Sequence, residues 1–108
     1  MPERPRSART EADASHTWRV DLHGDIDMNT APALSERLED LARHQAVLVI
    51  VDLEDVEFLD SSGLRALVHG ARAIEDTGGR LLVEGASGAV ARVLELTDLL
   101  QRLSAGGE

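Results

Sequence analysis

The sequence contains no cysteine, no lysine and no tyrosine, and it has only one tryptophan and one phenylalanine. Without cysteine the chain can form no disulfide framework and carries no thiol chemistry. Because aromatic residues make up only 2 % of the chain, the core has to be aliphatic, built from leucine, valine, isoleucine and alanine. The absence of lysine also excludes the lysine-containing phosphate loop of many nucleotide-binding proteins.

Long apolar segments are missing as well. The longest apolar run covers residues 46–51, far short of the about 20 residues that cross a bilayer. The first residues, MPERPRSART, lack the apolar region of a secretory signal. We therefore expect a cytoplasmic protein that does not bind a membrane.

The charge balance narrows the range of partners. The formal net charge of the 108-residue chain is -9, and all of its fully charged basic residues are arginines. Nucleic-acid binding needs clustered positive charge, so we expect no DNA or RNA partner. An acidic domain of this kind can instead bind a protein that carries a basic patch.

The hydrophobic pattern predicts alternating strands and helices. Apolar and polar side chains alternate over residues 17–23, which indicates a strand with one solvent-exposed face. Residues 46–51 form a continuous apolar run, typical of a central strand covered on both faces. In chain order, the predicted elements are a strand over 17–23, a helix over 31–43 with Thr30 as its N-cap, a strand over 46–51, a helix over 61–76, a strand over 80–84 and a helix over 88–97.

This order predicts an α/β fold with a small, mostly parallel sheet, because parallel strands need crossover connections of helix length. The length favours one domain, which we place at residues 11–103. Residues 1–10 predict a disordered tail, residues 11–14 a weak edge strand and residues 104–108 a frayed end.

Polar residues follow two of the predicted strands. Asp25 and Asp27 lie in the loop over residues 24–29, and Asp60 directly precedes a predicted helix. Open α/β sheets bind their ligands at the carboxyl ends of their strands, so these positions form the best candidate functional surface. For Asp25 and Asp27, simple turn chemistry is an equally good interpretation. The four histidines are scattered, without metal-ligand spacing, and we expect no metal site and no cofactor.

The stretch LDSSGLRAL, residues 59–67, allows three interpretations: a helix cap, a catalytic nucleophile or a modification site. The nucleophile elbow G-x-S-x-G is absent, which argues against an enzyme with a catalytic serine. A cap is ordinary before an amphipathic helix, but this stretch offers three cap candidates. Gly63 lowers helix propensity, which indicates close approach by a backbone or a partner, or local packing. A phosphate on Ser61 would be tolerated, because a helix start presents free N–H groups.

Four segments together resemble the STAS domains of anti-sigma factor antagonists. They are DLEDVEFLDSSGL over residues 52–64, LHGDID over 22–27, GGRLLV over 78–83 and AVARVLELT over 89–97. The resemblance covers about residues 15–100. Two features depart from the family pattern: Asp98 stands where many members have glycine, and the usual last strand and C-terminal helix are largely missing.

The resemblance implies a mixed sheet with helices packed on one side. It also implies a protein that binds an anti-sigma factor which is itself a serine kinase and binds ATP, and that thereby releases the sigma factor. Phosphorylation at Ser61 would end this binding, and a serine phosphatase would restore it. The implied contact residues are Asp25, Asp27, Met28, Asn29, Asp60, Ser62, Gly63 and Leu64. The alternative is a STAS scaffold subunit of a transport or signalling complex that is never phosphorylated.

Overall fold

The computed structural model of the protein describes residues 8–12 and 16–96. Four strands and three helices follow one another in an order close to the one predicted. They are β1 (Ala8–Ala12), β2 (Thr17–His23), α1 (Ala31–Arg43), β3 (Leu48–Asp55), α2 (Ser61–Asp76), β4 (Arg80–Glu84) and α3 (Gly88–Leu96).

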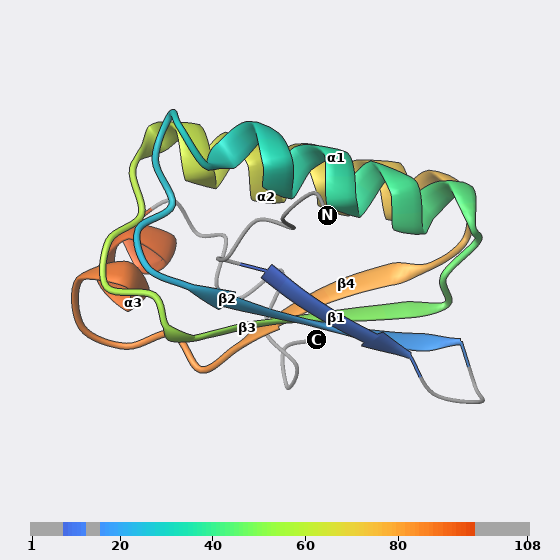
Figure 1. Ribbon diagram of the computed structural model, residues 1–108, viewed down its shortest axis with the longest axis horizontal. Helices are drawn as coiled ribbons and strands as arrows, with labels where there is room; N and C mark the ends of the chain where they lie inside the picture. Colours follow the sequence, from blue (N-terminus) through green and yellow to red (C-terminus); the bar gives the residue numbers. More distant parts are fainter. Residues whose placement is uncertain (1–7, 13–15, 97–108) are drawn as a thin grey trace, which may run out of the picture.

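The strands form one sheet in the order β1-β2-β3-β4. β1 pairs antiparallel with β2, whereas β2, β3 and β4 are mutually parallel. Helices α1 and α2 lie together over one face of this sheet (Figure 1). The prediction of a mixed, mostly parallel sheet with helices on one side is therefore confirmed. β2 and β3 end at the edge of the sheet where α1 and α2 begin, and α3 lies at the same end (Figure 1).

The core lies between the sheet and the two long helices, and it is aliphatic as expected. Alternate strand residues point into it, in rows set by the register Val20↔Val51↔Val83. Each helix adds one stripe of small and aliphatic side chains at helical spacing. The fully buried members include Val20, Leu22, Leu38, Val49, Val51, Leu53, Leu67, Ile74, Leu81, Val90 and Leu94.

Three expectations about the strands need correction: where the edge strand begins, where β3 begins, and whether β3 is covered on both faces. The edge strand begins at Ala8, not at residue 11, so residues 8–10 do not belong to a tail. Its backbone pairs in register with β2, and this pairing needs no apolar pattern that a sequence could display. β3 begins two residues later than predicted. Helices α1 and α2 cover only one of its faces (Figure 1), and the side chains of Leu48 and Ile50 are therefore only half-buried. The expectations for residues 1–7, 13–14 and 97–108 lie outside the described residues.

The ends of the helices follow from local sequence. α1 begins after Thr30 with Pro32 in its first turn, as predicted. Thr30 occupies the N-cap position, but its side chain makes no capping hydrogen bond to the helix, because its hydroxyl is bonded within the preceding turn. α2 ends at Asp76, and Gly78 then takes a φ of +90°, a left-handed conformation that glycine adopts without steric cost. Within residues 8–12 and 16–96, no helix has both the length and the apolar character needed to cross a bilayer.

Candidate functional site

The loops that follow β2 and β3 are bound to each other through their backbones. The Ile26 N–H donates to the Phe58 carbonyl at 2.9 Å, and the Asp60 N–H donates to the Ile26 carbonyl at 3.2 Å. Ile26 and Leu59 form an isolated parallel bridge and are both buried. The starts of α1 and α2 are therefore held side by side at one edge of the sheet, which is where the sequence placed the candidate surface.

Asp60 is the N-cap of α2. Its Oδ1 accepts hydrogen bonds from the Ser62 N–H at 2.8 Å and from the Gly63 N–H at 3.1 Å. The backbone of Asp60 is extended, as an N-cap residue requires, and its carbonyl accepts from the Leu64 N–H at 3.0 Å. Asp60 thus supplies the side-chain cap of α2, and neither Ser61 nor Ser62 is needed for this role.

Ser61 is the first residue of α2, and its side chain is exposed. No hydrogen bond to its hydroxyl comes from the part of the chain that the structure describes. Ser62, one position further, is half-buried and lines a shallow groove between α1 and α2. The two serines therefore differ in accessibility, and Ser61 is the one with an open hydroxyl.

Gly63 is buried where α2 crosses the loop after β2. A Cβ at this position would lie 2.9 Å from the Ile26 carbonyl oxygen and 2.8 Å from the Ile26 Cγ2. Such contacts are too short for a carbon atom, so only glycine lets the helix approach this loop. Of the interpretations that the sequence left open for Gly63, two are observed: the close approach of another backbone segment of the chain, and local packing against the side chains of Leu59 and Ile26.

Asp27 closes the turn before α1. Its Oδ1 accepts from the Asn29 N–H at 2.9 Å and from the Thr30 N–H at 3.3 Å. The Thr30 hydroxyl accepts from the Asp27 N–H at 3.0 Å and donates to the Asp25 carbonyl at 2.9 Å. Turn chemistry therefore accounts for Asp27, as one of the two interpretations had it, whereas the side chain of Asp25 is exposed.

Exposed apolar side chains lie in both loops. Met28 is 71 % exposed and Phe58 is 49 % exposed. Met28 also lines the groove between α1 and α2, together with Pro32, Ser35, Ser62, Arg65 and His69. Of the other predicted contact residues, Asn29 is exposed and Leu64 is half-buried against the core. Phe58, Arg65 and His69 were not predicted as site residues, although Arg65 is one helical turn from Ser61.

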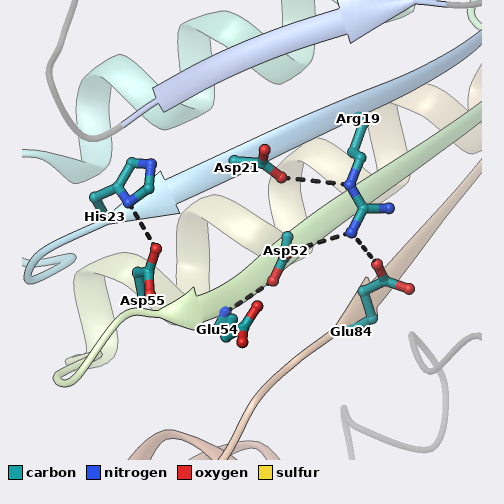
Figure 2. Close-up of polar contacts among 7 residues, drawn as sticks. All are labelled: Arg19, Asp21, His23, Asp52, Glu54, Asp55 and Glu84. Carbon is teal, nitrogen blue, oxygen red and sulfur yellow. Dashed lines mark hydrogen bonds and ion pairs between the residues drawn. The ribbon is translucent and has the colours of Figure 1, made fainter.

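A second cluster of polar side chains lies on the sheet face opposite α1 and α2 (Figure 2). Asp21, Asp52 and Glu84 occupy one register row across β2, β3 and β4. Arg19 contacts all three carboxylates: its Nε lies 3.5 Å from Asp21, and its Nη2 contacts Asp52 at 3.0 Å and also Glu84. The hydrogen bond to Glu84 is the main cause that raises the pKa of Arg19 above its ordinary value.

The composition of this cluster points to a structural role. Like charges directly opposite one another destabilise neighbouring strands, and Arg19 offsets that repulsion. Histidines contact carboxylates at separate places in the described part of the fold. His23 Nδ1 lies 3.0 Å from Asp55, and His69 Nε2 lies 2.5 Å from Glu39. Among residues 8–12 and 16–96, no group of three or more ligands could hold a metal ion.

Comparison with known proteins identifies the family. The family model described as "Mlab, STAS domain" matches residues 10–104, which is most of the chain. The chain belongs to the STAS-domain family. A curated relative of this STAS domain, the anti-sigma-B factor antagonist of Bacillus subtilis (strain 168), is 37% identical over 81 residues. That match covers 75% of this chain and 73% of the relative.

Solved structures show the same fold. The crystal structure of an anti-sigma factor antagonist from Mycobacterium paratuberculosis matches this STAS domain with a TM-score of 0.78 at 29% identity, over 89% of this chain and 80% of the solved one. The phosphorylated form of the Bacillus cell fate determinant SpoIIAA matches with a TM-score of 0.71 at 22% identity, over 85% and 84% of the two chains.

Proposed function

We propose that this STAS domain is an anti-sigma factor antagonist controlled by phosphorylation of Ser61. The unphosphorylated domain binds an anti-sigma factor that is a serine kinase, and the sigma factor is released in the cytoplasm. The kinase binds the ATP and transfers its terminal phosphoryl group to the Ser61 hydroxyl. The phosphorylated domain then dissociates, and a serine phosphatase restores the hydroxyl.

The observation that carries this proposal is that Asp60 caps α2 while the Ser61 hydroxyl makes no hydrogen bond to the described part of the chain. Asp60 provides the cap, so the exposed Ser61 hydroxyl is available to an enzyme without loss of a structural hydrogen bond. A phosphate there adds about 1.5 to 2 negative charges beside the positive end of the helix. The fold can tolerate this charge, whereas a partner docked on the same surface has to accommodate it.

The surrounding surface suits a protein partner. Met28 and Phe58 supply exposed apolar side chains from the two loops, and Asp25 and Asn29 are exposed polar residues in the same loop as Met28. Protein interfaces commonly combine an apolar centre with a polar rim. The names of the relatives support the same conclusion, since the relative from Bacillus subtilis and the solved chain from Mycobacterium paratuberculosis are both anti-sigma factor antagonists.

The experiment starts from a partner captured from the native cell with the Ser61→Ala variant as bait, and then purified. Incubation of that partner with ATP should phosphorylate the unmodified domain at Ser61, as mapped by mass spectrometry. Ser62→Ala should still be phosphorylated at Ser61, and Ser61→Ala should not be phosphorylated. Phosphate found only at another residue would refute the site assignment.

Calorimetry measures the switch itself. Ser61→Ala should bind the purified partner as the unmodified domain does, while Ser61→Asp should bind at least about tenfold more weakly, which is about 1.4 kcal/mol. Equal affinities for the two variants would contradict the switch. A captured partner that binds tightly but never transfers phosphate would favour the alternative of a STAS scaffold subunit.

A further inference from the structure

Arg65 lies one helical turn after Ser61 on α2, and both side chains are exposed. Residues four positions apart on a helix are neighbours on its surface, with about 5–6 Å between their Cβ atoms. Arg65 also lines the groove between α1 and α2 together with Met28 and Ser62. Its long side chain can therefore reach the space directly outside the Ser61 hydroxyl.

Arg65 makes no ion pair with any residue in the described ranges, although the chain has an excess of carboxylates. By comparison, Arg19 contacts three carboxylates, and Arg43 lies 3.5 Å from Asp40. The nearest acid in sequence to Ser61 is Asp60, and its carboxylate points to the N–H groups of Ser62 and Gly63. The candidate phosphorylation site thus has an unpaired cation beside it.

We propose that Arg65 is the intramolecular partner of a phosphate on Ser61, an inference that rests on the proposed function of this site. The guanidinium donates charge-assisted hydrogen bonds to phosphate oxygens, which arginine makes in a fork geometry. Phosphorylation then changes the docking surface in two ways. It adds negative charge at Ser61, and it withdraws the cation of Arg65 from any carboxylate on the binding partner.

The test measures the phosphate directly and needs no kinase. Phosphoserine is installed at position 61 by genetic encoding, and the second pKa of the phosphate, ordinarily about 6, is followed by ³¹P NMR titration. We expect this pKa to be about 0.5 higher in Arg65→Gln than in the unmutated phosphoprotein, because the ion pair favours the dianion. The difference should shrink in 1 M salt, as expected for an exposed pair.

Arg72 provides the matched control. It is an exposed arginine on the same helix, also without an ion pair to a described residue, and it lies three turns from Ser61. Arg72→Gln removes the same charge and should leave the phosphate pKa unchanged, while Arg65→Lys should restore part of the effect through its point charge. The proposal is overturned if Arg65→Gln and Arg72→Gln give the same phosphate pKa as the unmutated phosphoprotein.

The outcome is separable from that of the proposed function. If no kinase phosphorylates Ser61, the proposed function fails, yet the encoded phosphoserine still reports whether Arg65 pairs with it. If the kinase phosphorylates Ser61 but the pKa does not depend on Arg65, the function stands and the role of Arg65 is refuted.

Discussion

Helices α1 and α2 begin beside each other, and an aspartate closes the turn before each of them. Asp27 accepts from two N–H groups ahead of α1, and Asp60 accepts from two N–H groups in the first turn of α2. The hydroxyls that follow these aspartates have different surroundings. The Thr30 hydroxyl makes hydrogen bonds to the backbones of Asp25 and Asp27, whereas the Ser61 hydroxyl is open to solvent.

The hydroxyl at the start of α1 is therefore structural, whereas the hydroxyl at the start of α2 is available for modification. At α1 the hydroxyl is part of the turn, so a group attached to it would break the turn. At α2 the carboxylate of Asp60 is the only side-chain cap among the described residues, and the neighbouring Ser61 hydroxyl makes no structural hydrogen bond there. A reversible modification that acts on the surface needs this second arrangement, because the domain has to stay folded in both states.

Among single substitutions at these helix starts, Asp60→Ala should lower the unfolding free energy most. The substitution removes the acceptor of the Ser62 and Gly63 N–H groups, and loss of an N-cap costs about 1–2 kcal/mol of unfolding free energy. Urea denaturation followed by circular dichroism measures this change. Asp60→Ser should recover much of the loss, since serine can also cap a helix. A loss below about 0.3 kcal/mol for Asp60→Ala would mean that another group caps α2.

Removal of the Thr30 hydroxyl should lower the unfolding free energy more than removal of the Ser61 hydroxyl. Thr30→Val keeps the shape of the side chain but removes the hydrogen bonds to Asp25 and Asp27, so we expect a loss of about 1 kcal/mol. Ser61→Ala removes an exposed hydroxyl, and the change should stay within about 0.5 kcal/mol. The comparison fails if denaturation gives equal losses for the two variants.

Much of this site could be predicted from sequence, because its signals are local. A polar residue before an apolar helical stripe predicts the start of α2, and the alternation over residues 17–23 predicts β2. The resemblance of residues 52–64 to STAS domains gave the family, which the family match over residues 10–104 confirms. The assignment of Ser61 as phosphorylation site stays a prediction.

Features that depend on register could not be predicted. The row of Asp21, Asp52 and Glu84 exists only because three strands align, and a single sequence does not display that alignment. The role of Gly63 depends in the same way on the loop after β2, whose Ile26 carbonyl would lie 2.9 Å from an added Cβ. For the edge strand, the sequence indicated a weak strand over residues 11–14 but not its bounds Ala8–Ala12, because these depend on backbone pairing with β2.

Whether phosphorylation of Ser61 leaves the fold intact is tested by the unfolding free energy of the domain with phosphoserine encoded at position 61. Because Asp60 caps α2 and the helix start favours negative charge, we expect a value within about 0.5 kcal/mol of that of the unmodified domain. Phosphothreonine encoded at position 30 is the matched control, and it should cost at least about 1 kcal/mol, since it breaks the hydrogen bonds of the Thr30 hydroxyl. A loss of more than about 1.5 kcal/mol on phosphorylation of Ser61 would contradict a switch that acts on the surface and leaves the fold intact.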